Sequence, residues 1–137
     1  GLIVLGDAMT SFNPVYGQGM SVAWLQAVAL DEILAGREQK GTGLDGLARD
    51  FFPVAAQISR NAWNGSTLVD SAYEEVTGDM RPGTEGDIAF MAGLRTLLTD
   101  DPELHADYIG VGQMTTPVEA LVNADRMERA VAAIQHR

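Results

Sequence analysis

Residues 2–20 read LIVLGDAMTSFNPVYGQGM, and this stretch decides which fold the sequence predicts. Residues 2–5 are all apolar, and Gly6 closes the run. A short apolar run ended by glycine is typical of a strand that is buried on both faces. No other segment is rich enough in β-branched residues to be its partner. The sequence therefore predicts one N-terminal strand whose sheet neighbours lie outside this chain.

The rest of the chain predicts about five helices, so the expected fold class is mostly α with a single strand. Residues 64–86 contain several glycines and Pro82, and they predict loops around a short helical piece. Pro53 is expected to kink or divide the second helix. The predicted helices cover residues 19–35 with Gly36 as terminator, 44–63, 86–99, 101–113 and 116–135.

The composition is that of a globular chain of about one domain, and it excludes some classes of binding partner. The 137 residues are 46% hydrophobic and 20% charged. Nine basic against nineteen acidic residues give a net charge of −10, which repels nucleic acid and anionic lipid. No apolar run approaches the length of a membrane span. The absence of cysteine excludes disulfides and thiolate metal sites, and it suits the cytoplasm.

The turn that follows the predicted strand has features of a ligand site. Asp7 would lie just beyond the carboxyl end of a strand, where open α/β sheets bind their ligands. Pro14 stiffens the connection, while Gly17 and Gly19 let the backbone approach a ligand closely. A long helix begins at this point, and its free N–H groups attract negative charge. The stretch predicts a site for a ligand with hydroxyl groups and a negatively charged part.

The segment GDAMTSFNPVYGQGMSVAWLQAVAL resembles the third flavin-binding motif of the FAD-dependent aromatic-ring hydroxylases and epoxidases, the para-hydroxybenzoate hydroxylase-like monooxygenases. The shared pattern is GDA, then proline, then G-x-G-M and a helix. Where the family usually has asparagine after this methionine, the chain has Ser21. The later segments FFPVAAQISRNAW, DSAYEEVTGDMRPG and LTDDPELHADYIGVGQM resemble the helical tail of family members.

The resemblance implies a domain organisation. Residues 1–36 would be the last strand, GD loop and flavin-facing helix of a FAD-binding domain of the glutathione reductase type, and residues 37–137 a helical C-terminal region. The chain would then be the C-terminal portion of a longer enzyme, because in this family a GxGxxG turn near the N-terminus holds the ADP half of FAD. The implied partner is that missing FAD-binding part, or a second copy pairing through the strand at residues 2–5. Alone, the chain is expected to be inactive.

The resemblance also assigns the site and the reaction. FAD would be reduced by NAD(P)H and would transfer one oxygen atom from O₂ to a small hydrophobic substrate, by hydroxylation of an aromatic ring or epoxidation of an alkene. No residue is an obvious catalytic acid or base. Trp63, Tyr73 and Phe90 would line a substrate pocket or, as is usual for aromatics at helical spacing, belong to the core. The implied flavin contacts are Gly6 and Asp7 at the ribityl chain, Pro14 at the isoalloxazine ring, and the amides around Gly17, Gln18, Gly19 and Met20 at the pyrimidine edge.

Two other classes of function remain open. A helical interaction module would use the strand to pair with a partner and would need no flavin. A serine hydrolase would use Ser21 in an approximate G-x-S-x-G elbow, with Asp70 and then His105 or His136 following in order, but such an elbow needs a preceding strand. The GxGxxG at residues 41–46 follows charged residues instead of a strand and predicts a helix linker. The two histidines lack the spacing of metal ligands.

Overall fold

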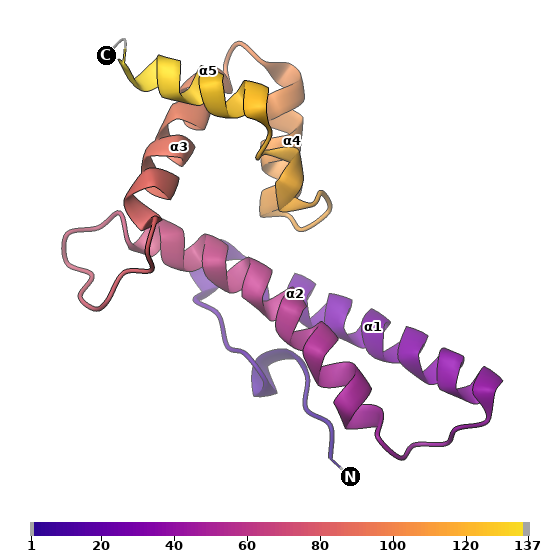
Figure 1. The fold of residues 1–137 in the computed structure, drawn as a ribbon. Coiled ribbons are helices and arrows are strands. Elements are labelled where there is room, and N and C mark those ends of the chain that lie inside the picture. The colour runs from indigo at the N-terminus through magenta and orange to yellow at the C-terminus, as the bar shows by residue number, and fades with distance from the viewer. Residues whose placement is uncertain (1, 136–137) are drawn as a thin grey trace. The chain divides into compact units, whose positions relative to one another are not determined.

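The computed structural model describes residues 2–135, and every regular element in that range is helical (Figure 1). The chain up to Ser66 forms one compact unit and the chain from Thr67 onward a second, so the division falls in the last turn of α2. The predicted domain division after residue 36 concerns a longer parent and stays a prediction. The elements are η1 (Gly6–Ala8), η2 (Pro14–Tyr16), α1 (Gly19–Lys40), α2 (Leu47–Asp70), α3 (Thr84–Leu97), α4 (Pro102–Gly112), η3 (Val118–Ala120) and α5 (Ala124–Gln135), where η marks a 3₁₀ helix.

The predicted N-terminal strand is wrong. Leu5 has an extended backbone, with φ −149° and ψ 171°, but residues 2–5 form no strand and pair with no segment between residues 2 and 135. Leu2 is 81% exposed, so the apolar run is not buried as predicted. A strand exists only through its ladder of hydrogen bonds, and no described segment offers one. The α/β assignment is therefore also wrong, while the mostly α character is confirmed. Association of two copies through residues 2–5 stays a prediction.

In the first unit, α1 and α2 form an antiparallel helical hairpin (Figure 1). Helix α1 continues past the predicted terminator Gly36 and ends at Lys40. The residue that ends it is Gly41, whose left-handed φ of 64° suits glycine, and Thr42 N–H closes the last turn by donating to Arg37 O. The helix is thus one turn longer than predicted.

The loop at residues 41–46 is the linker that the sequence predicts for its GxGxxG pattern. The Arg37 side chain fixes it from within α1: Nε donates to Gly43 O at 2.9 Å, and the other guanidinium nitrogens bond Asp45 O and the carboxylate of Asp50. The loop joins two helices and does not follow a strand, so it lacks the context of a nucleotide-binding turn.

Helix α2 is not divided by Pro53, which lies in its second turn, and it extends to Asp70 through residues predicted as loop. Pro53 is the seventh residue of the helix, so its missing N–H leaves one intrahelical hydrogen bond, to the carbonyl of Arg49, unmade while the helix continues. The buried residues recur at intervals of three or four, as one face of a helix requires. They are Phe51, Ala55, Ser59, Ala62 and Ser66.

The second unit is built on the crossing of α3 and α5. Gly93 of α3 lies against the backbone of Ala130 in α5, and both residues are buried. Helix α5 begins at Ala124, after Asn123 Oδ1 accepts from Arg126 N–H, and not at residue 116 as predicted. Residues 118–120 form the separate turn η3 instead. The buried cluster of this unit comprises Leu94, Leu104, Leu121 and Ala130.

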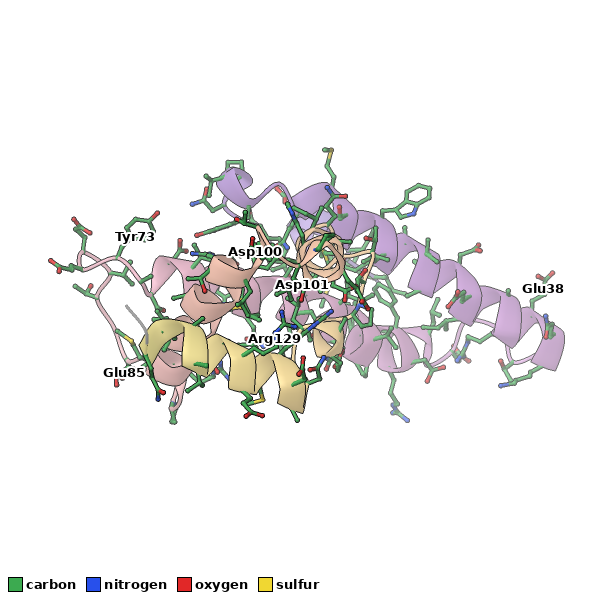
Figure 2. The ribbon with its side chains drawn as sticks, turned by 90° about the horizontal axis from the view of Figure 1, so that it is seen from above. Glu38, Tyr73, Glu85, Asp100, Asp101 and Arg129 are labelled. Atoms are coloured by element: carbon green, nitrogen blue, oxygen red, sulfur yellow. The ribbon has the colours of Figure 1, made fainter. Side chains whose placement is uncertain are left out.

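Asp101 connects two helices of the second unit and is expected to make its stability depend on pH. Its carboxylate accepts from Leu104 N–H at 2.9 Å, which caps α4, and bonds Arg129 of α5 at 2.6 Å (Figure 2). The cap and the guanidinium hold the pKa of Asp101 below its ordinary value of 3.8. A carboxyl whose pKa is lower in the folded state stabilises that state above its unfolded pKa, and this stabilisation disappears as pH falls through the folded pKa.

Asp101→Asn should therefore flatten the acid limb of the stability curve. Asparagine still caps a helix, so near neutral pH the variant loses only the charge on the pair with Arg129. The free energy of unfolding, measured by urea titration at several pH values below 5, should fall less steeply with decreasing pH in the variant than in the parent chain. Equal slopes would contradict the assigned role.

Candidate functional site

The predicted site residues all lie in the first unit, in the irregular segment that leads into α1. Gly6 and Asp7 belong to η1, Pro14 to η2, and Gly19 and Met20 to the first turn of α1. All seven predicted residues are among those that the structure describes, and they lie in one continuous stretch before and at the start of the helix. No described residue beyond this stretch was predicted to contact flavin.

The η1 turn is fixed at Gly6. This glycine is buried with a left-handed φ of 60°, and a Cβ added to it would lie 3.1 Å from Ala23 Cβ in α1. Its N–H donates to the side-chain oxygen of Gln26 at 2.6 Å. Asp7, the next residue, is exposed and makes no hydrogen bond or ion pair with another described residue. The exposed carboxylate of Asp7 thus follows directly on a buried glycine whose position is fixed by α1.

The η1 turn lies close to the beginning of α1. Ala23, which Gly6 touches, is four residues after Gly19, and four residues correspond to about 6 Å along a helix axis. The η1 turn that carries Asp7 therefore packs on α1 about one helical turn beyond the start of the helix.

The η2 turn lies directly before α1 in the chain. The Asn13 side chain caps it by accepting from Val15 N–H at 3.1 Å, and Pro14 occupies its first position, where the missing N–H costs nothing. Gly17 ends it with φ 67°, and its own N–H donates to Pro14 O at 3.1 Å. The Gly17 amide is therefore engaged within the turn, which leaves the amides at the helix start as the donors for an anion.

The first turn of α1 is open. Gln18 precedes the helix and makes no side-chain cap, and the first hydrogen bond of the helix runs from Val22 N–H to Gln18 O. The N–H groups of the residues before Val22 in the helix have no intrahelical acceptor. A Cβ added to Gly19 would meet nothing within 4 Å, and Met20 is 85% exposed. The first turn of α1 therefore has both the space and the N–H donors to bind a negatively charged group.

The loop between the two turns is attached to α2. Thr10 Oγ1 lies 3.1 Å from Ser59 Oγ, and the Phe12 ring packs on Trp63 with centroids 6.2 Å apart. The segment that carries the predicted contacts is thus held by α1 at one point and by α2 at two. Sequence reasoning missed Gln26 and Ser59 as supports of this site. The available signal was Gln26 itself, the one polar residue in the otherwise apolar run of residues 22–30.

The three aromatics considered for a substrate pocket have different surroundings. In the first unit, Trp63 is half-exposed and contacts Phe12. In the second unit, Tyr73 is exposed on the segment between α2 and α3 (Figure 2), whereas Phe90 packs against the buried cluster. Phe90 also borders an apolar hollow of about 590 Å³ between α3 and α5. Of the three aromatic residues, Phe90 is therefore the one that both packs against the core and borders a hollow.

The residues of the alternative sites are also located. Ser21 lies in the first turn of α1 and follows η2, so it lacks the strand-to-helix turn of a nucleophile elbow. His105 is exposed on α4, and His136 lies outside the described residues. Between residues 2 and 135 no group of three histidine, aspartate or glutamate side chains is placed to hold a metal ion. In the same range no helix is both long enough and apolar enough to cross a bilayer.

Comparison with known proteins gives a similarity to part of one longer protein. No protein-family model matches the chain, and no solved structure matches it. A stretch of 82 residues is 32% identical to Protein Rv3254 of Mycobacterium tuberculosis. That stretch covers 60% of this chain and 17% of the relative, so the chain spans a small part of that protein's length. The relative's name states no activity, and the similarity therefore carries no functional assignment.

Proposed function

We propose that this chain supplies the flavin-facing part of an FAD-dependent monooxygenase that hydroxylates or epoxidises a small hydrophobic aromatic or alkene substrate. The observation that carries the proposal is the open first turn of α1, where Gly19 has no neighbour within 4 Å. The motif-like order of residues 6–20 supports it. FAD, reduced by NAD(P)H, would supply the chemistry that activates O₂. A cytoplasmic location, expected from the cysteine-free sequence, would supply the nicotinamide.

Different residues in the stretch 6–20 would bind different parts of the cofactor. The exposed Asp7 carboxylate would accept hydrogen bonds from ribityl hydroxyls, and it is available because no side-chain partner for it lies among residues 2–135. The amides of Gly19 and Met20, at the positive end of the α1 dipole, would stabilise negative charge on the pyrimidine edge of the reduced ring. Pro14, exposed in η2, would border the isoalloxazine ring. The ADP half would be bound by a part of the protein other than residues 2–135.

Replacing Asp7 or Gly19 tests this site in the complete gene product that contains the chain. Asp7→Ala should weaken FAD binding by about 1.5–3 kcal/mol, because it removes a charge-assisted hydrogen bond. Gly19→Val should weaken it further, since the side chain would fill the open space that the ring edge needs. Flavin absorbance per mole of purified protein and an FAD titration measure both effects.

Gly36→Val is the matched control for Gly19→Val. Gly36 lies in the same helix, and a Cβ added to it also meets nothing within 4 Å. This control should retain full flavin content and the parent's helix content by circular dichroism. If Asp7→Ala and Gly19→Val also purify with full flavin, the site is wrongly assigned.

A helical interaction module without flavin is the second candidate, and one observation favours it. Met20, Trp24 and Val28 lie four residues apart on α1 and are 85%, 71% and 39% exposed, so they form an apolar stripe. On this reading Trp24→Gln should abolish association measured by light scattering, while Asp7→Ala should leave it unchanged. Flavin binding that depends on Asp7 would decide against this candidate.

A further inference from the structure

The Gln26 side chain is an unusual interior residue for an apolar helix. It is fully buried in α1, and both ends of its amide are used. Oε1 accepts from Gly6 N–H at 2.6 Å, and Nε2 donates to Ser59 Oγ at 2.9 Å with Met9 Sδ at 3.8 Å. Burying an amide is costly unless its hydrogen bonds are satisfied, so these bonds are needed wherever glutamine occupies this position.

The bonds of Gln26 connect three segments that are distant in sequence. Its oxygen holds the backbone of the η1 turn, and its nitrogen holds Ser59 in the middle of α2. Ser59 Oγ also lies 3.1 Å from Thr10 Oγ1, just after the turn. The η1 turn is therefore fixed at both ends, by Gln26 before Asp7 and by Ser59 after it. A leucine at position 26 would pack between the helices, but it would leave the Gly6 N–H without its acceptor.

The residue held between these two supports is the one with a free side chain. Gly6 lies so close to α1 that a Cβ added to it would be 3.1 Å from Ala23 Cβ, and its left-handed φ of 60° sets the direction of the peptide that leads to Asp7. The Asp7 side chain itself is exposed and makes no hydrogen bond or ion pair within residues 2–135 that would fix the turn. The network thus sets the direction of the backbone that carries the carboxylate.

We propose that Gln26 and Ser59 are positioning residues that hold the Asp7 turn in the orientation required by the ribityl chain of FAD. This inference rests on the proposed function, in which Asp7 is the contact residue. Both residues act through the backbone of η1 and neither touches the cofactor. Preorganising a contact lowers the entropy that binding must overcome, so loosening the turn should reduce affinity even though the carboxylate remains.

Two buried serines of α2 provide a matched pair for the test. Ser59 bonds Gln26 and Thr10, whereas Ser66, seven residues later on the same buried face, bonds only carbonyls of its own helix, Ala62 O and Trp63 O. Ser59→Ala and Gln26→Leu should each lower the FAD affinity of the complete gene product roughly tenfold, the effect of one lost hydrogen bond with loosening of the turn. Ser66→Ala should leave the affinity within about twofold of the parent.

A double-mutant cycle shows whether Gln26 acts through Asp7. In an Asp7→Ala background, Gln26→Leu should lower FAD affinity by less than about twofold, because the contact that it positions is already absent. A full tenfold effect in that background would mean that Gln26 acts independently of Asp7 and would overturn the inference.

Hydrogen exchange provides a readout that does not depend on flavin. In this chain, Gln26→Leu should accelerate amide exchange of the segment around Gly6 at least tenfold while exchange in the middle of α2 stays unchanged. Unchanged exchange at the turn would overturn the inference. If Asp7→Ala loses affinity but Gln26→Leu and Ser59→Ala behave like Ser66→Ala, the positioning role is wrong and the flavin site stands. If Asp7→Ala itself has no effect on FAD binding, the proposed function is wrong and the inference falls with it.

Discussion

Gly93→Ala is expected to destabilise the second unit by about 3 kcal/mol, at the upper end of the usual range for overpacked cores. A Cβ at position 93 would lie 2.3 Å from Ala130 O, 2.8 Å from Ala130 C and 3.0 Å from Ala130 Cα. All three atoms belong to the backbone of α5, so no side-chain rotation can relieve the overlap. The helix itself gains about 0.5–1 kcal/mol from the replacement of glycine by alanine, which offsets only part of the cost.

Gly86→Ala is the matched control in the same helix. A Cβ at Gly86 meets nothing within 4 Å, so this variant should be as stable as the parent or more stable by up to about 1 kcal/mol. Urea unfolding followed by far-ultraviolet circular dichroism measures the free energy of unfolding of each variant. Equal midpoints for Gly93→Ala and Gly86→Ala would contradict the close crossing of α3 and α5.

The sequence predicts the helices well where the signals are local. Asp101 and Pro102 mark the start of α4 as expected, since an aspartate cap and a proline at the first position act within one turn. The end of α1 was misplaced because Gly36 and Gly41 are equally good terminators in a local pattern. Arg37, which bonds the loop after Gly41, stabilises the longer helix through contacts that the pattern does not encode.

The strand was mispredicted for a different reason. The run at residues 2–5 has the composition of a buried strand, and Leu5 does adopt an extended backbone. Composition specifies that local conformation but not a partner, and the part of the chain that the structure describes contains none. A strand assignment depends on a second segment and therefore needs more than local sequence.

The residues of the predicted site do form turns that lead into a helix, but the sequence does not indicate which residues support them. Gln26 contacts residues 20 positions earlier and 33 positions later, and such pairings follow from the packing of α1 against α2. The Gly17 amide, predicted as a flavin donor, is engaged by Pro14 O, a detail set by the 3₁₀ geometry of η2. The fold thus determines which backbone donors of the predicted site are available, and residue types alone do not.

The 137-residue chain by itself is expected not to retain FAD. The proposed site offers Asp7 and the amides at the start of α1, which would contact the ribityl chain and the pyrimidine edge only. The GxGxxG pattern at residues 41–46 cannot supply the pyrophosphate contacts, because it is a helix linker fixed by Arg37. Loss of three or four hydrogen bonds at about 1.5 kcal/mol each weakens binding by roughly three to four decades.

Disorder of the site does not add to this loss. Thr10 and Phe12 attach the loop to α2, Asn13 caps η2, and Gln26 holds η1, so contacts within the chain fix the segment. The expected deficit therefore comes from missing contacts and not from the entropy of folding a loop. For this reason a second polypeptide that carries the ADP-binding part should restore binding when it is added to the folded chain.

Absorbance and fluorescence of FAD measure whether the chain retains the cofactor. The purified chain should be colourless, and micromolar FAD should keep its free absorbance spectrum and fluorescence in the presence of the chain. The proposed site would still bind weakly, so millimolar riboflavin should shift the amide resonances of Gly19 and Met20 in the parent chain and not in Gly19→Val. A yellow preparation with stoichiometric flavin would show that residues 1–137 bind the whole cofactor and would refute the requirement for a separate ADP-binding part.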